Sequence, residues 1–412
     1  MNRGKVITMF ALALAVMALG IGAWAVDPPG KAEGVRSFMP VPTFWAATAT
    51  ANGKIYVIAG SGYSADGTQT STNTVQIYDP ATDTWTLGAP KPTPIYLCTA
   101  SVVDGKIYVM GGRTPGDSGG PVNTNEMYDP ATDTWTAKKV IPVSVRGHST
   151  TAVGTKIYLW GGNTSAYQKT SKIYDTVANT WAVGPTMPDF FAYGNAIYNP
   201  IKNKVYIVGG VKSGTPSASN FNTGAWIFDV ATDAFESNKP AMPVPVREHG
   251  IALNSDGSRL YVFGGSFWDS STSPPAEAEF SLNQVLDCDT NIWQSLETSE
   301  LPPFPSPPDR SEYPMAGSIG GKIYIVGGTP GADVVSLTEV YDPSVWSFWE
   351  PNPKSSVTRQ APAVQAVRSI CASAPTRPSS VRYTLLETTW PRDSFEPSIC
   401  HTVTARLNQV SA

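Results

Sequence analysis

A repeated strand pattern constrains the fold of this 412-residue chain more than any other feature. The octapeptide YDPATDTW occurs twice without change, at residues 78–85 and 128–135. A run of β-branched and aromatic residues that ends in two small residues occurs six times, and self-similarity at a period near fifty residues indicates a repeat architecture. The six runs are IYVIAG from Ile55, IYVMGG from Ile107, IYLWGG from Ile157, VYIVGG from Val205, LYVFGG from Leu260 and IYIVGG from Ile323.

Each repeat predicts four antiparallel strands. A segment such as residues 149–153 is rich in Thr, Ala and Val, and a short turn at Gly154 and Thr155 joins it to the apolar run as a hairpin. The run does not alternate, which is typical of a strand covered on both faces. An Asp-rich turn then separates two further strands that carry a Tyr and a Trp. One such sheet cannot bury both faces alone, but six copies around an axis can.

The composition agrees with a turn-rich β protein. With 36 Gly and 36 Pro, few stretches are free of residues that interrupt helices. The aromatic content of 10% argues against disorder. The net charge of -4 offers no basic surface, so we expect no nucleic-acid partner.

The Gly doublet, the Tyr-Asp pair and the following Trp resemble the kelch repeat. The resemblance implies an all-β fold: a six-bladed kelch β-propeller of four-stranded antiparallel blades, with the first strand of each blade lining a central channel. Two residues depart from the pattern, namely Ala59 in place of the first Gly of unit one and Leu286 in place of Tyr in unit five. A degenerate seventh blade, built from the C-terminal tail, is the alternative.

Four segments are predicted along the chain. Residues 1–25 have the charges, the apolar run and the small residues of a signal peptide cleaved after Ala25. An uncleaved membrane anchor is the alternative, and both interpretations place the remainder outside the cytoplasm. We expect a linker at 26–40, the propeller at 41–350, and a divergent, loosely ordered tail at 351–412.

Four cysteines need an explanation, because export permits disulfides. Cys98 and Cys288 lie in distant repeats and are expected to be buried free thiols. Cys371 and Cys400 both lie in the tail, where they are either bridged or free.

In kelch propellers, the loops that enter the first strands and those that leave the doublets emerge on one face, and the resemblance implies that ligands bind there. Arginine holds carboxylates with two parallel bonds, and aromatic rings stack on sugar faces or cations. The same arginines can instead bond to nearby backbone carbonyls. The predicted ligand-binding rim comprises Trp45, Tyr63, Tyr96, Arg113, Arg146, His148, Tyr193, Arg247, His249, Trp268, Arg310, Glu312 and Tyr313.

An enzymatic function has less support in the sequence than ligand binding. The kelch family that the chain resembles includes copper radical oxidases, which hold their metal with two His and two Tyr. Here the two propeller histidines, His148 and His249, are expected in blades three and five, too far apart to share a metal. We therefore expect no metal or other cofactor and assign no catalytic residue. A sugar-acid epimerase or mutarotase is the alternative, with Glu248 or Glu312 as proton shuttle.

The sequence thus predicts a secreted or periplasmic monomer that binds a protein segment or a glycan. Contact with a membrane is expected only through an uncleaved signal segment.

Overall fold

The structure is a computed structural model that describes residues 32–63, 69–115, 119–214, 217–272, 274–279, 283–293, 313–328, 336 and 338–343. These residues all belong to one unit, Met1–Glu350. The predicted signal peptide, the tail with its two cysteines, and rim residues Arg310 and Glu312 lie outside the described residues. None of the helices in the described part is long and apolar enough to cross a membrane.

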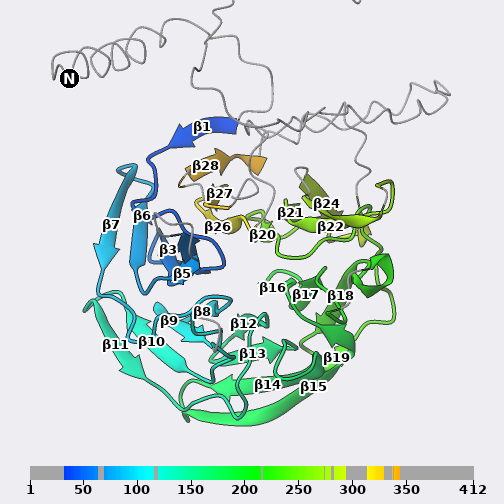
Figure 1. Ribbon diagram of the computed structural model, residues 1–412, viewed down its shortest axis with the longest axis horizontal. Coiled ribbons are helices and arrows are strands. Elements are labelled where there is room, and N and C mark those ends of the chain that lie inside the picture. The colour runs from blue at the N-terminus through cyan, green and yellow to red at the C-terminus, as the bar shows by residue number, and fades with distance from the viewer. Residues whose placement is uncertain are drawn as a thin grey trace, which may run out of the picture. The chain divides into compact units, whose positions relative to one another are not determined.

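Six four-stranded antiparallel sheets are arranged around a common axis, which confirms the six-bladed propeller (Figure 1). In each blade the strand that comes first in the repeat lies innermost, next to the central channel, as predicted (Figure 1). The strands of each blade are given below from the innermost to the outermost. Blade one contains β2 (Ala47–Ala51), β3 (Lys54–Ile58), β6 (Val75–Asp79) and β7 (Thr84–Gly88); blade two β8 (Thr99–Val103), β9 (Lys106–Met110), β10 (Asn125–Asp129) and β11 (Thr134–Ala137); blade three β12 (Ser149–Val153), β13 (Lys156–Trp160), β14 (Gln168–Asp175) and β15 (Thr180–Phe191).

The other three blades have the same order. Blade four contains β16 (Asn195–Asn199), β17 (Lys204–Val208), β18 (Ala225–Asp229) and β19 (Ala234–Phe235), with the short 3-10 helix η1 (Ala218–Asn220) before β18; blade five β20 (Gly250–Leu253), β21 (Arg259–Phe263), β24 (Asn283–Asp287) and β25 (Ile292–Trp293); blade six β26 (Met315–Ile319), β27 (Lys322–Val326), β28 (Thr338–Tyr341) and β1 (Ala32–Arg36).

The last blade is closed by the start of the propeller. Strand β1 pairs antiparallel with β28, with Val35 opposite Glu339 and Arg36 opposite Thr338. Residues 32–36 therefore belong to a blade, although the sequence predicted a linker over 26–40. The strand is short and contains a glycine, so it lacks the pattern that marked the other strands.

The apolar runs form the core between blades. Ile55, Val57 and Ile58 of β3 have no exposed surface, as predicted for a strand covered on both faces. Each hydrophobic cluster combines neighbouring blades; one of them, for example, contains Ile58 of blade one and Val109 of blade two. Burial of this kind on both sides of every sheet is the main force that holds the ring together.

The repeated octapeptide builds a polar staple between blades. In blade two, the Tyr128 hydroxyl donates to Asp133 Oδ1 at 2.5 Å, and the same oxygen accepts the Ala89 N–H of blade one at 2.6 Å. The Trp135 indole N–H donates to the Ala89 carbonyl at 2.9 Å. Both backbone groups of Ala89 are thus satisfied by the next blade. Equivalent sets are Tyr78, Asp83 and Trp85 on Ser37, and Tyr174, Asn179 and Trp181 on Lys139.

The first aspartate of each octapeptide forms the turn, as the sequence predicted. Asp79 Oδ1 accepts the Ala81 N–H at 2.9 Å, and Asp129 Oδ1 accepts the Ala131 N–H at 3.1 Å. These side-chain bonds to the backbone two residues later are Asx turns.

The two departures from the kelch pattern are accommodated by their surroundings. Ala59 has a left-handed φ of 59° and packs in one cluster with Cys98, whose small thiol leaves space for the methyl group. Leu286 is fully buried and pairs with Trp293, as Tyr128 does with Trp135. Cys98 and Cys288 are buried free thiols, which confirms the prediction for both.

Candidate functional site

One residue of each blade forms a ring of backbone around the channel mouth. These residues precede the first strands, and all six have φ between 52° and 58°. Left-handed backbone costs about 1–2 kcal/mol for a residue with a Cβ, and such strain tends to persist at functional sites. We call them the mouth ring: Trp45, Leu97, Gly147, Tyr193, Glu248 and Tyr313.

Hydrogen bonds between neighbours hold the mouth ring. Five of the six N–H groups donate to the carbonyl of the equivalent residue in the preceding blade. The distances are 2.9 Å from Leu97 to Trp45, 3.3 Å from Gly147 to Leu97, 2.7 Å from Tyr193 to Gly147, 2.7 Å from Glu248 to Tyr193 and 3.1 Å from Tyr313 to Glu248. The ring fixes where five side chains leave the backbone, so the strained conformation presents them at one opening.

A cavity of about 270 Å³ lies inside the mouth ring and is lined by all six blades. Below the ring its walls are mostly small side chains, including Thr48, Ala100, Ala196 and Ala316. A second cavity, of about 460 Å³, lies at the other end of the first strands and shares Ile197, Ile251 and Ala316 with the first. These three shared residues therefore lie where the two cavities adjoin.

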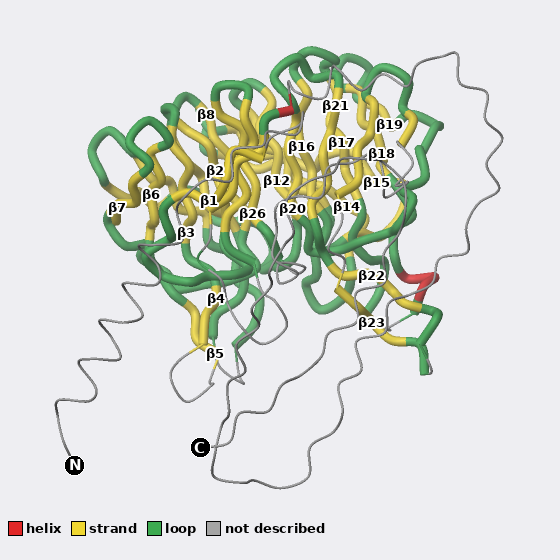
Figure 2. Tube along the Cα trace, turned by 90° about the horizontal axis from the view of Figure 1, so that it is seen from above, coloured by secondary structure: helices red, strands yellow, loops and turns green. Residues whose placement is uncertain are grey.

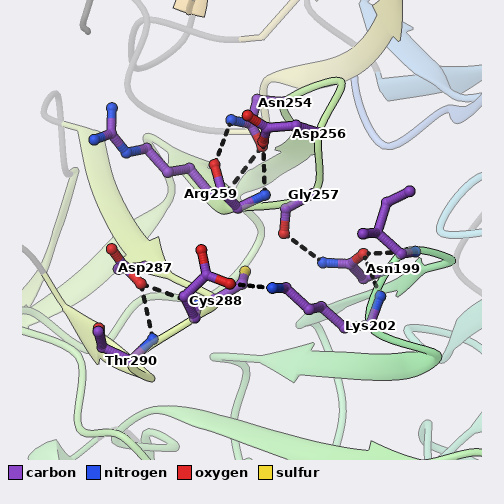
Figure 3. Close-up of polar contacts among 12 residues, drawn as sticks. Asn199, Lys202, Asn254, Asp256, Gly257, Arg259, Asp287, Cys288 and Thr290 are labelled. Atoms are coloured by element: carbon purple, nitrogen blue, oxygen red, sulfur yellow. Dashed lines mark hydrogen bonds and ion pairs between the residues drawn. The ribbon is translucent and has the colours of Figure 1, made fainter.

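Polar contacts join blades four and five at that second end (Figure 3). The Asn199 side-chain amide donates to the Gly257 carbonyl at 2.7 Å, and its oxygen accepts the backbone N–H groups of Ile201 and Lys202. Lys202 also pairs with Asp289 of blade five. The polar groups of these residues are paired with one another, which indicates a structural role for this end of the channel.

Aromatic side chains gather on one side of the mouth. Trp45 stacks on Tyr96 with ring centroids 5.5 Å apart and planes at 17°, and meets Tyr313 edge-on at 4.8 Å. Phe44 lies 4.8 Å from Trp45 and 5.7 Å from Tyr313. We call Phe44, Trp45, Tyr96 and Tyr313 the aromatic cluster. The structure thus brings three of the predicted rim residues together.

Arginine and tyrosine gather on the other side. The Arg247 guanidinium carbon lies 6.0 Å from the centroid of the Tyr193 ring, and Tyr167 meets the same ring edge-on at 6.3 Å. A Cβ on Gly147 would lie 2.6 Å from the Tyr193 ring, so the glycine lets this ring lean across the mouth. Burial raises the pKa of Tyr193, although the positive charges of Arg146 and Arg247 act in the opposite direction. We call Arg146, Tyr167, Tyr193 and Arg247 the Arg-Tyr cluster.

The three rim arginines that the structure describes differ in their partners. Arg247 makes a bidentate pair with Glu277 at 2.5 and 2.7 Å and lies 3.4 Å from Glu248. Arg113 Nε donates to the Gly119 carbonyl at 3.0 Å, which is the backbone role that the sequence left open. Among the described residues no carboxylate lies within 4 Å of the Arg146 guanidinium, and its buried Nε makes no hydrogen bond with them. Of the rim arginines in the described part of the chain, Arg146 is therefore the cation that is available to a ligand.

The two histidines predicted on the rim line the cavity but are almost fully buried in its wall. His148 and His249 are 2% and 1% exposed, because each imidazole packs against the first glycine of the preceding blade. A Cβ on Gly111 would clash with the His148 ring, and one on Gly209 would lie 2.9 Å from the His249 ring. Both side chains fill space between blades. Within the described residues, no group of three His, Cys, Asp or Glu side chains could hold a metal ion.

Two hairpins carry further predicted residues. Tyr63 ends β4 (Ser61–Tyr63), which pairs with β5 (Gln69–Ser71), and Trp268 lies in β22 (Ser266–Asp269), which pairs with β23 (Ala276–Glu279). Both hairpins extend from the same face of the ring (Figure 2). Sequence reasoning missed Tyr167 and Glu277, which lie four and twelve residues beyond Asn163 and Gly265, in the loops that follow two doublets.

The buried histidines predict a loss of stability in weak acid. Burial lowers the pKa of both to about 3, against about 6.5 in the unfolded chain. Because the unfolded chain binds more protons between these values, the free energy of unfolding should fall as the pH drops below 6.5. The slope should reach about 1.4 kcal/mol per pH unit for each histidine. Urea unfolding between pH 7 and 4.5 measures it.

The matched variant is His148→Gln/His249→Gln, whose slope should be flatter over this range whatever its absolute stability. An unchanged slope would contradict the assignment. The carboxylate of Asp133, whose pKa is lowered by hydrogen bonds from Ala89 and Tyr128, adds a separate loss only at lower pH, as it becomes protonated.

A six-bladed ring with the doublets, the octapeptide staples and a ligand-sized mouth defines a kelch propeller. The chain belongs to the family described as the KLHDC2/KLHL20/DRC7 Kelch-repeats domain, which matches residues 32–191 and 195–373. The first match begins at β1, in agreement with its place in blade six.

Three individual kelch proteins resemble this chain over very different shares of their own length. Kelch-like protein terF of Aspergillus terreus (strain NIH 2624 / FGSC A1156) is 28% identical over 376 residues, covering 78% of this chain and 68% of that protein. F-box/kelch-repeat protein At1g67480 of Arabidopsis thaliana is 41% identical over 68 residues, or 16% of this chain and 17% of that protein. Kelch repeat and BTB domain-containing protein 12 of Homo sapiens is 34% identical over 94 residues, or 21% and 15%. The matches thus span less than a fifth of the latter two proteins.

A solved structure entitled "Structure of YjhT" superposes with a TM-score of 0.59. It covers 74% of this chain and 95% of that one at 16% sequence identity. At this identity the likeness shows the fold alone.

Proposed function

We propose that the protein is an extracytoplasmic binding module that holds an acidic protein segment at the channel mouth. A protein-binding role agrees with the kelch family to which the chain belongs. The extracytoplasmic location rests on the positive charges of Arg3 and Lys5, followed by an apolar run and Ala25.

The proposal depends on one observation, namely that the guanidinium of Arg146 is unpaired within the described part of the chain. Arg146 is a half-buried residue whose positive charge acts to lower the pKa of Tyr193, and its guanidinium has no carboxylate partner among the described residues. A carboxylate can accept two parallel bonds from such a guanidinium, and charge-assisted bonds of this kind are about twice as strong as neutral ones. A partner carboxylate at Arg146 would satisfy a cation that the propeller itself leaves open.

The aromatic cluster supplies the apolar part of the site. Trp45 and Tyr313 are partly exposed and line the cavity, and aromatic side chains commonly dominate the energy of protein interfaces. Trp45 and Tyr313 of the cluster line the cavity, and Arg146 directly precedes Gly147, which lines it from blade three. The segment we propose therefore combines an acidic side chain with an apolar one.

A glycan is the second candidate, because the partly exposed Trp45 ring could also stack on a sugar face. An enzyme acting on a sugar acid has less support. Arg247, its candidate clamp, is already bound to Glu277 and Glu248, so the adjacent Glu-Arg pair forms a local ion-pair network.

Arg146→Ala tests the proposal. Blocked hexaglutamate labelled with fluorescein serves as the acidic probe, hexaglutamine as its neutral counterpart and sialic acid as the sugar-acid competitor. Loss of one charge-assisted pair should weaken hexaglutamate binding by roughly 10- to 100-fold. Fluorescence anisotropy at constant salt gives the dissociation constants.

Arg259→Ala is the matched control. Arg259 lies at the opposite end of blade five, where its guanidinium extends away from the polar contacts (Figure 3), so the variant removes the same charge far from the mouth. Equal effects of the two variants would show a general charge effect and reject the site. Displacement of the probe by sialic acid, together with faster anomer exchange in proton NMR, would instead favour the enzyme.

A further inference from the structure

The hairpin formed by β22 and β23 places a carboxylate on the rim. Arg247 Nε donates to Glu277 Oε1 at 2.5 Å, and the terminal nitrogen donates to Oε2 at 2.7 Å. This is the bidentate geometry that guanidinium groups use for carboxylate ligands. Glu277 therefore occupies Arg247 in the manner expected of a partner's acidic side chain.

The position of the hairpin makes this contact possible. Its root is attached to the rim, because Arg247 and Ser266 exchange two backbone hydrogen bonds of 2.9 Å. From there it extends beyond the mouth face (Figure 2), and its other strand places Trp268 opposite Glu277. Only four residue pairs connect β22 and β23, and an isolated two-stranded hairpin is marginally stable. The distal part of the hairpin can therefore move while its root stays in place.

The ion pair itself is suited to exchange. The side chains of Arg247 and Glu277 are 26% and 30% exposed, so water and a competing carboxylate can reach the pair. Arg247 also keeps a second carboxylate, Glu248, at 3.4 Å, so it is not left without compensation when Glu277 leaves. A competing carboxylate thus meets a small barrier.

Arg146 and Arg247 both act on the same tyrosine. The charges of both guanidinium groups act on the Tyr193 hydroxyl, and Arg247 lies over its ring. An acidic segment that crosses Tyr193 would reach both cations. Within the described ranges, Arg247 has a carboxylate partner and Arg146 has none.

We propose that Glu277 is an internal competitor for the ligand site: it holds Arg247 while the mouth is empty and yields it to a carboxylate of the bound acidic segment. The inference rests on the proposed function and extends it by naming the residue that limits affinity. Ligand recognition then needs two acidic groups, one at Arg146 and one at Arg247, on either side of Tyr193.

Glu277→Gln tests this inference with the same hexaglutamate probe. Without the competing charge, hexaglutamate should bind about threefold to tenfold more tightly, as expected for release of a well-formed bidentate pair. In an Arg247→Ala background the same substitution should have no effect, because there is no cation left to release. Hydrogen exchange of residues 266–279 should also become faster when the probe binds the wild-type protein.

Asp269→Asn is the matched control, since it removes one negative charge from the same hairpin. Asp269 Oδ1 accepts the N–H of Ser271 at 2.8 Å, a bond that the asparagine can keep. Equal gains in hexaglutamate affinity for Glu277→Gln and Asp269→Asn would overturn the proposal that Glu277 competes for Arg247. A gain in affinity that persists in the Arg247→Ala background would overturn it as well. An unchanged affinity in Glu277→Gln while Arg146→Ala still weakens binding would overturn it and leave the proposed function intact. No binding by any variant would reject both.

Discussion

Replacing Gly111 by alanine should lower the free energy of unfolding by about 2–5 kcal/mol. Gly111 has a φ of 58°, where a Cβ is strained, and the added methyl group would clash with the His148 ring and lie 2.7 Å from the Val145 carbonyl oxygen. The His148 ring is buried, and the Val145 oxygen belongs to the backbone. Neither group can therefore move without opening the contact between blades two and three. Urea unfolding followed by tryptophan fluorescence measures the change.

Gly154→Ala separates the two contributions. Gly154 has the same φ of 58°, but nothing lies within 4 Å of its added Cβ. This variant should lose only the backbone part, about 1–2 kcal/mol. If both variants lost the same amount, packing against His148 would play no part in the requirement for glycine at the doublet. A Gly111→Ala chain that fails to fold, beside a folded Gly154→Ala protein, agrees with the prediction.

Replacing Lys91 by methionine should cost about 3–5 kcal/mol. Lys91 has no exposed surface; its ammonium donates to Glu126 and, at 3.1 Å, to the Thr93 carbonyl. Glu126 also accepts the Thr93 hydroxyl at 2.8 Å. The substitution leaves a buried carboxylate without its cation, and an uncompensated buried charge is strongly destabilising. Chemical unfolding at pH 7 measures the loss.

Two further variants identify the cause. Lys91→Met/Glu126→Gln should recover much of the stability, because the charge that lost its partner is gone. Lys106→Met removes a lysine from the more exposed pair with Asp129 in the same blade and should have little effect. A double variant as unstable as Lys91→Met would show that lost packing, and not the unpaired carboxylate, is responsible.

The six blades could be predicted because each carries local signals. The apolar runs, the doublets and the octapeptide all lie within a single repeat, so the strands and their order follow from neighbouring residues. Strand β1 carries no such signal, because its partner β28 lies some three hundred residues away. The contact that makes residues 32–36 a strand exists only once the ring is closed.

The mouth could be predicted only in part, for a similar reason. Trp45, Tyr193 and Tyr313 occupy equivalent positions in their repeats, so the register of the repeats brings them together. The rings of His148 and His249 instead pack against glycines of other blades, a contact that no local pattern reveals. The pairing of Arg247 with Glu277 likewise depends on how one hairpin folds back over the rim.

The joint between β1 and β28 also sets how the propeller comes apart. An open row of repeats can lose its terminal unit first, since that unit has a neighbour on one side only. Here the earliest and latest described strands share blade six, so every blade has two neighbours and none is terminal. Detaching residues 32–36 removes the chain connection between blade six and blade one, so that side-chain packing between these two blades must then keep the circle closed.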